Sequence, residues 1–197
     1  MRTVTFFILF SFFSLATPSQ GQSLLDRLDS AIAAKPEVVR QKNQRLDILK
    51  SSIRKERNVM LLLNLYERIY EEYYVYNFDE ANKYNEEGLR LANKVGAGNY
   101  VQLFTINKVH LLSISGLYSE AEKTAGSIDV RLLNNDQKFS YYTALFELYS
   151  YWSDYCHDHI FSPRYRAYAD SCLVRAMRFL PSEKGIRNYY MGELATY

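Results

Sequence analysis

The stretch FDEANKYNEEGLRL, residues 78–91, decides the fold class of this chain. Its apolar and small residues recur at steps of three and four, which is the spacing of one face of an amphipathic helix. Two of these residues, Ala81 and Gly88, are small enough for a second helix to approach closely. Tyr76 and Asn77 form a predicted loop that separates this helix from an apolar helix before it. The stretch therefore predicts a hairpin of two closely packed antiparallel helices.

Similar hairpins recur toward the C-terminus. Aligned on the small residue near the start of each second helix, they place Ala81, Ala121 and Ala169 at intervals of 40 and 48 residues. Periodicity at about 20 to 50 residues indicates a solenoid of stacked repeats. Residues 100–115 are apolar on nearly every side, which predicts a helix packed between neighbours. We therefore expect an all-α fold, an α-solenoid of antiparallel helix hairpins.

Prolines and capping residues set the expected boundaries. Pro36 is expected to end a short helix over residues 23–34 and to open a longer one over 37–57, because proline fits a first helical turn. Ser119, with Glu122 three residues later, predicts a capping box, and Ser162 before Pro163 predicts an N-cap. We thus expect N-terminal helices over residues 22–57 and hairpins over 58–197. The last hairpin is incomplete, because residues 182–197 supply only its first helix.

The N-terminus has the pattern of a targeting signal. Arg2 precedes a mostly apolar run from Val4 to Ala16, which is too short for a membrane-spanning helix of about 20 residues. Ser19 and Gly21 are small residues at the right spacing for cleavage before Gln22. We therefore expect residues 1–21 to be a secretory signal peptide and the rest of the chain to be exported.

Composition and charge narrow the function classes. The 197 residues are 48 % hydrophobic and 23 % charged with a net charge of +2, which is typical of a globular domain and gives no field that favours nucleic acid. A basic run over residues 40–57 and an acidic run over 67–87 are expected to be solvated faces that complement each other when their helices pack. An acidic binding strip is the alternative. The sequence has no nucleophile elbow and no glycine-rich phosphate loop, so no enzyme is predicted from motifs.

The hairpins resemble the tetratricopeptide repeat. In the first two hairpins an aromatic residue, Phe78 or Tyr118, stands three positions before the alanine, and in the third Pro181 follows Ala176. The intervals are longer than the usual period of about 34 residues. The first helices also lack the usual tryptophan and glycine. The resemblance therefore supports stacked helical hairpins more firmly than a regular superhelix.

A narrower resemblance covers nearly all of residues 22–197. It rests on the segments LLDRLDSAIAAKP, RQKNQRLDILK, LYERIYEEYYVYNFDEANKY, LLSISGLYSEAEK and YSYWSDYCHDHIFSPRYRAYADSCL. These are similar to the start of a family of exported tetratricopeptide-like proteins of Gram-negative bacteria whose shared domain has no assigned function. Full-length members add more repeats, one transmembrane helix, a coiled coil and a cytoplasmic part, and are labelled transcriptional regulators. The resemblance implies a periplasmic N-terminal part whose membrane tether lies beyond residue 197.

One cluster in the sequence has the composition of a metal site. Cys156, His157, Asp158 and His159 are residue types that suit zinc. However, Cys156 falls on an apolar stripe and the other three fall in a predicted loop, so a helix-end loop is the main interpretation. A small zinc-dependent hydrolase centred on His157 and His159 is the alternative. Cys156 and Cys172 are expected to stay unpaired, because their positions along the two helices are too far apart for a disulfide.

The candidate binding surface is aromatic. The first helices of such hairpins line the concave face of a solenoid, which is the usual binding face. The predicted groove consists of Tyr66, Tyr70, Tyr73, Tyr74, Asn107 and His110. Packing between repeats is the competing interpretation for the tyrosines. We predict a non-enzymatic module, without a cofactor, that binds a peptide, a protein or a glycan in this groove. A third hypothesis is a scaffold that assembles with copies of itself through residues 182–197.

Overall fold

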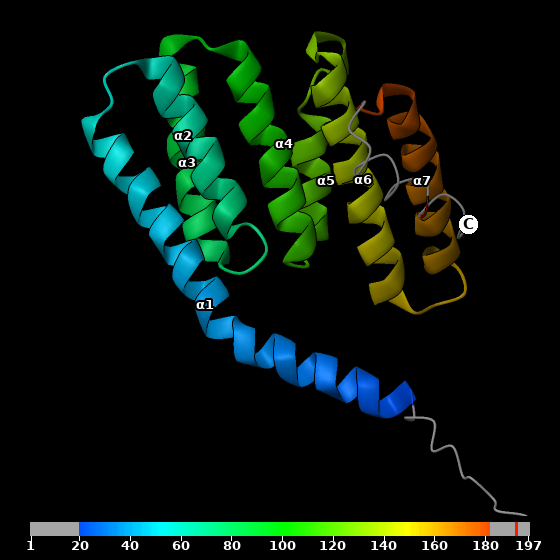
Figure 1. Cartoon of the computed structure of the whole chain (residues 1–197). Helices are drawn as coiled ribbons and strands as arrows, with labels where there is room; N and C mark the ends of the chain where they lie inside the picture. Colours follow the sequence, from blue (N-terminus) through cyan, green and yellow to red (C-terminus); the bar gives the residue numbers. More distant parts are fainter. Residues whose placement is uncertain (1–19, 182–191, 193–197) are drawn as a thin grey trace, which may run out of the picture. The chain divides into compact units, whose positions relative to one another are not determined.

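The computed structural model describes residues 20–181 and residue 192. Over these residues the chain forms seven α-helices and two short 3-10 helices, with no β-strand (Figure 1). The α-helices are α1 (Gln20–Lys55), α2 (Val59–Tyr73), α3 (Phe78–Val95), α4 (Gly98–Ile114), α5 (Tyr118–Gly126), α6 (Asn135–Cys156) and α7 (Phe161–Ala176). The 3-10 helices are η1 (Val130–Leu132) and η2 (Met177–Phe179). The predicted all-α fold of helix hairpins is therefore confirmed.

Two expected segments fall outside this description. The predicted signal peptide, residues 1–21, is described only at Gln20 and Gly21, and the predicted last helix, residues 182–197, only at Gly192. None of the described helices is long and apolar enough to cross a membrane. The chain divides into two compact units, residues 1–44 and residues 45–197, so α1 contributes to both.

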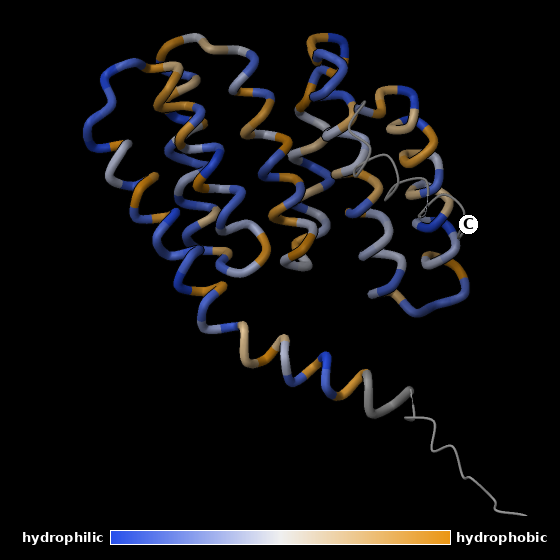
Figure 2. The backbone as a smooth tube through the Cα atoms, viewed as in Figure 1, coloured by the Kyte–Doolittle hydropathy of each residue, from blue (hydrophilic) through white to orange (hydrophobic). Residues whose placement is uncertain are grey.

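Within the first unit, α1 continues through Pro36, so the predicted helix break at this proline is wrong. Proline inside a helix leaves one carbonyl without its amide donor and costs about 3 kcal/mol. Ala33 and Ala34 precede the proline, and alanine is the residue that most favours a helix. After it, Glu37 and Arg40 form an ion pair of 2.7 Å one turn apart on the same helix. Figure 2 shows apolar and polar residues alternating along this part of α1.

The second unit begins with the last turns of α1, which pack on the first hairpin. Leu46 and Leu49 are buried in a cluster with residues of α2 and α3, which include Ile69, Tyr73 and Tyr84. The Lys50 ammonium donates a hydrogen bond of 2.7 Å to the Tyr73 hydroxyl. Arg45 also forms an ion pair of 2.9 Å with Glu72. The basic run of α1 thus meets the acidic run of α2, as the sequence predicts.

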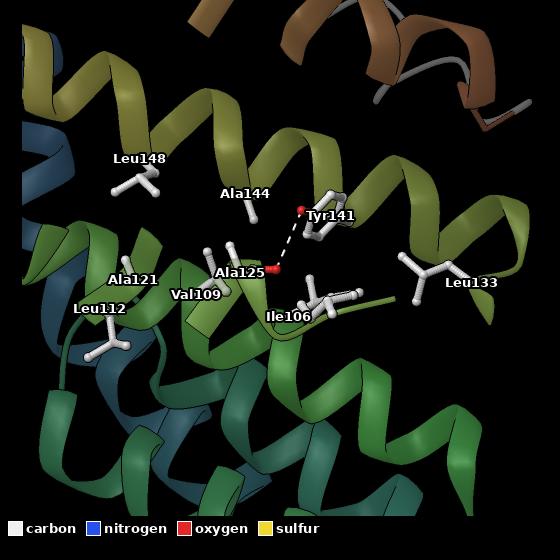
Figure 3. Packing of buried hydrophobic residues seen from close by; sticks show 10 residues of the cluster. Ile106, Val109, Leu112, Ala121, Ala125, Leu133, Tyr141, Ala144 and Leu148 are labelled. Atoms are coloured by element: carbon white, nitrogen blue, oxygen red, sulfur yellow. Dashed lines mark hydrogen bonds between the residues drawn. The ribbon is translucent and has the colours of Figure 1, made fainter. Parts of the chain in front are cut away.

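Three hairpins follow, α2–α3, α4–α5 and α6–α7, and Figure 1 shows their helices side by side in chain order. Each hairpin contacts the next one, because α4 packs on α3 and α6 packs on α4. In Figure 3, Ile106, Val109 and Leu112 of α4 face the small residues of α5 and the inner side of α6. The Tyr141 hydroxyl donates to the Ala125 carbonyl at 3.5 Å across this interface.

Small residues set the distances between these helices. Ala81, Ala121 and Ala169, on which the sequence aligns the hairpins, are all fully buried. At Gly88 a Cβ atom would lie 2.3 Å from Cζ of Phe104, so α3 and α4 approach too closely for any other residue without a shift. Nearby, the buried Asn85 amide donates to the Phe104 carbonyl at 2.9 Å. The predicted close packing at Ala81 and Gly88 is confirmed.

Asparagine and aspartate, not serine, cap the helices. Asn58, Asn77 and Asn134 accept backbone hydrogen bonds at the starts of α2, α3 and α6, and Asn134 forms a capping box with Gln137. The capping box predicted at Ser119 is wrong, because α5 begins one residue earlier without a side-chain cap.

The cap predicted at Ser162 is also wrong. The Asp158 carboxylate accepts the amides of Ile160 and Phe161 at 2.7 Å each, and this places Ser162 inside the first turn of α7. There the Ser162 hydroxyl donates to the Ser153 carbonyl of α6 at 2.9 Å. The serine therefore joins the two helices of the third hairpin.

The tryptophan at position 152 lies where the last two hairpins meet. Its ring stacks on Tyr165 of α7 with the ring centroids 4.4 Å apart, and on Tyr118 of α5 at 5.7 Å. Because Trp152 belongs to α6, one aromatic stack joins three helices.

Candidate binding face on the first helices

The first helix of each hairpin contributes side chains to one continuous surface, which we call the first-helix face. It consists of Glu67, Tyr70 and Glu71 from α2 with Tyr74 directly after it, of Tyr100, Leu103, Asn107 and His110 from α4, and of Gln137, Ser140 and Glu147 from α6. On each helix these residues are three or four positions apart or multiples of a turn apart, so they share one side.

Tyr70 joins α2 to α4 at this face. Its side chain is buried and its hydroxyl donates a hydrogen bond of 2.8 Å to the Asn107 carbonyl. Burial, followed by the nearby Tyr74 and Glu147, raises the pKa of Tyr70 well above its usual value. Burial thus favours the protonated hydroxyl, which is the form that donates the hydrogen bond to Asn107.

His110 joins α4 to α6 next to this contact. Its Nδ1 atom lies 2.8 Å from a carboxylate oxygen of Glu147, and both side chains are mostly buried. The Tyr74 ring meets the His110 ring edge-on with the centroids 6.3 Å apart. Tyr74 also contacts Tyr70, at 5.8 Å between ring centroids. Hydrogen bonds and ring contacts therefore link all three first helices.

A cavity of about 310 Å³ opens beside this network. It is lined by Glu67, Asn99, Tyr100, Leu103, Asn134, Asp136, Gln137 and Ser140. The Gln137 amide is fixed at both ends, because it donates to the Asn99 carbonyl at 2.8 Å and accepts the Asn134 amide at 3.2 Å. The cavity thus combines the apolar walls of Tyr100 and Leu103 with polar groups that are held in place.

Glu67 is the ionisable group most affected by this environment. Burial, and secondly the charge of Glu71, raise the pKa of Glu67 to about 7. Among the described residues, no lysine, arginine or histidine forms an ion pair with Glu67. The Glu67 carboxyl is therefore half-buried, and the negative charge that forms on it as the pH rises through about 7 has no ion-pair partner among the described residues.

Four of the six predicted groove residues come together at this face. Tyr70, Tyr74 and His110 belong to the network described above through their side chains, and Asn107 through its backbone carbonyl. Their role in binding stays a prediction, since the geometry alone does not test it.

The other two predicted residues, Tyr66 and Tyr73, lie on a different side of α2. Tyr73 is buried, stacks on Tyr84 at 6.1 Å and accepts a hydrogen bond from Lys50. Tyr66 also turns toward Tyr84, at 6.4 Å between ring centroids. Positions 66 and 73 are each one residue away from the face at 67, 70 and 74, which turns them by about 100° around the helix. Tyr73 packs against α3 and the last turns of α1, whereas Tyr66 contacts α3 and also lines a cavity of about 350 Å³ beside Glu87 and Arg90. The role of these two tyrosines in binding stays a prediction as well.

Sequence reasoning missed the residues that α6 contributes to the face. The stripe from Tyr142 through Leu145 and Tyr149 to Trp152 dominates that sequence, yet these side chains are only half-buried. The fully buried positions include Ala144 and Leu148, because α6 packs against both α4 and α7. Ser140 and Glu147, seven residues apart, were the available signal for the polar side that faces the groove.

A second cavity, of about 550 Å³, lies between the last turns of α1 and α2. Its charged groups compensate each other in part, since Arg45 pairs with Glu72 and Arg68 partly offsets the burial that raises the pKa of Glu71. The charged groups that line this cavity are therefore better compensated than those that line the cavity on the first-helix face.

Residues 156–159 lie at the end of α6 and in the loop between α6 and α7. Among the described residues, no three His, Cys, Asp or Glu side chains lie close enough together to hold a metal ion. His157 ends α6 in the left-handed conformation and Asp158 caps α7, so both have roles in the loop. Cys156 and Cys172 are free thiols, and burial raises the pKa of Cys172 to about 11. No observation within residues 20–181 favours a zinc hydrolase.

The comparisons with known proteins agree with the fold. Among curated proteins and among solved structures, nothing matches this chain. Residues 32–197 match the family described as the SusR N-terminal TPR domain, where TPR stands for tetratricopeptide repeat. The match covers the helices of the first-helix face and most of α1. The chain therefore belongs to the SusR N-terminal TPR domain family.

Proposed function

We propose that this chain is the periplasmic, ligand-binding part of a membrane-spanning regulator, and that its first-helix face binds a peptide segment of a partner protein. TPR domains generally mediate protein interactions. The family is named for an N-terminal domain, which agrees with a longer protein that continues beyond this region. The observation that carries the proposal is the cavity at which α2, α4 and α6 meet, with the walls of Tyr100 and Leu103.

The binding face is tested by filling the cavity. Ser140 is half-buried in its wall, so Ser140→Arg places a long side chain where the peptide is proposed to bind. The probe is a phage-displayed library of random dodecapeptides, selected on the immobilised full chain. The control is Ser119→Arg, an exposed position on α5. Selected peptides should lose at least about tenfold in affinity, or 1.4 kcal/mol, on Ser140→Arg and keep it on Ser119→Arg. Equal affinity on both variants, or no selected peptide at all, would refute the proposal.

The location is tested separately. Residues 1–21 carry the proposed export signal, so their fusion to alkaline phosphatase should give active enzyme in the periplasm of a Gram-negative host. Replacement of Leu9 by arginine interrupts the apolar run and should abolish that activity. An inactive fusion that carries the natural segment would contradict export.

A further inference from the structure

The cavity on the first-helix face offers a specific chemistry. One wall carries the Glu67 carboxylate and the rim carries Asp136, while no lysine or arginine is among the lining residues. Tyr100 and Leu103 form the apolar walls beside this carboxylate. The site therefore presents a cavity with an apolar wall and a polar wall, and with the Glu67 carboxyl inside it.

We propose that this cavity holds a lysine or arginine side chain of the bound peptide, with its cationic group on Glu67 and its aliphatic stem between Tyr100 and Leu103. The inference rests on the proposed function and names the kind of peptide that the face selects. Lysine and arginine bury their methylene groups along apolar surface while the charged end stays with a polar partner. An aromatic ring such as that of Tyr100 also attracts a nearby cation.

The electrostatics of Glu67 support this occupant. A half-buried carboxylate without a cation beside Glu71 is unfavourable in the free chain, as the raised pKa of Glu67 shows. A peptide cation would compensate it, because opposite charges attract more strongly in a partly desolvated site. A metal ion is a poorer occupant, since the described residues contain no group of three ligands.

The other charged surfaces of the described chain offer less support for a bound cation or anion. Arg45 pairs with Glu72, Lys108 with Glu86 and Arg131 with Asp129, so these groups are already compensated. At the C-terminal end of the face, Asp154 pairs with Arg166 at 2.6 Å. Glu67 therefore combines a cavity, apolar walls and an uncompensated charge in one place.

The same peptide library distinguishes this inference from the proposed function. Peptides selected on the full chain should share a lysine or arginine at one position of the aligned sequences. Replacing that residue by norleucine or citrulline, respectively, should weaken binding about tenfold or more. On Glu67→Gln the same replacement should change affinity less than about twofold, whereas on the control Glu120→Gln, an exposed position of α5, the tenfold effect should remain.

Each outcome tests the basic side chain in the cavity separately from peptide binding at the first-helix face. Selected peptides without a common basic residue, or a preference that survives in Glu67→Gln, would overturn the inference while leaving peptide binding at the face intact. Failure to select any peptide would overturn both. Glu67→Gln keeps the shape of the side chain, so a folding defect is not expected to obscure the result.

Discussion

Glu67 connects the stability of the chain to the pH. The folded chain holds the proton of this carboxyl more tightly than the unfolded chain, since the pKa rises from 4.5 to about 7. Unfolding therefore releases a proton between these values, and the contribution of Glu67 to stability falls as the pH rises through them. Glu71 adds to the shift by repulsion.

Glu67→Gln removes the free-energy cost of ionising this half-buried carboxyl group. A shift of this size corresponds to about 3 kcal/mol, and partial exposure of the side chain reduces the expected effect to about 1 to 2 kcal/mol. The variant should be more stable than the natural chain at pH 8 by this amount and nearly equal to it at pH 4.5. Urea unfolding followed by circular dichroism at both pH values measures the difference. A gain that is the same at both pH values would contradict the assigned pKa.

At the scale of single residues, the sequence predicted part of the candidate site. The spacing of Tyr70, Tyr74, Asn107 and His110 identified a shared side of α2 and α4, because helical periodicity is a local property. Glu67 entered only as one member of the acidic run. Its importance depends on burial and on the absence of a nearby cation, which the fold decides and the local sequence does not. The main expectation for that run, complementary solvated faces, holds for Glu72, which pairs with Arg45, but not for the half-buried Glu67.

At the scale of elements, α1 has two parts with different contacts. Residues 45–55 supply Leu46 and Leu49 to the core of the second unit, whereas Leu24, Leu28 and Ile32 of the first unit are exposed. Removing residues 1–44 should therefore leave the stability of the second unit almost unchanged.

Removing residues 1–57 should destabilise the second unit strongly. Burial of Leu46 and Leu49 accounts for about 3 to 6 kcal/mol, and the hydrogen bond between Lys50 and Tyr73 would also be lost. Urea midpoints of the two truncated chains, at the same pH, measure the difference. Equal midpoints would mean that the last turns of α1 contribute nothing to the core.

Element boundaries show where local signals were insufficient. The loop at Tyr76 and Asn77 and the stop at Gly96 were predictable, since Gly96 takes the left-handed conformation that ends a helix. Pro36 did not end its helix, α5 begins without a side-chain cap at the predicted Ser119, and at α7 the Asp158 carboxylate accepts backbone amides in place of the predicted Ser162 cap. Several polar residues compete for each cap, and the geometry of the loop selects among them.

At the scale of the second unit, the main contacts between the described helices join each hairpin to its neighbour along the chain. Such an arrangement allows one end to open while the other stays folded. Leu173→Ala, at a fully buried position of the α6–α7 hairpin, should cost about 2 to 5 kcal/mol and should speed hydrogen exchange mainly in α6 and α7.

Leu63→Ala is the matched change at the other end. This fully buried leucine packs against Ala92 and Phe104, so exchange should increase first in α2, α3 and α4. Hydrogen–deuterium exchange with mass spectrometry of both variants measures the two patterns. A uniform increase along the second unit in either variant would show that it unfolds as a single cooperative body.

The aromatic stack at Trp152 gives this end of the unit its own optical signal. The chain contains one tryptophan, and its ring is held between Tyr118 and Tyr165. Emission on excitation at long wavelength therefore comes from the junction of the last two hairpins alone, with no contribution from α2 or α3. A fluorescence melting curve of the unaltered chain accordingly reports the unfolding of that junction alone. A peptide that binds near Glu67 can leave the tryptophan emission unchanged while it is bound.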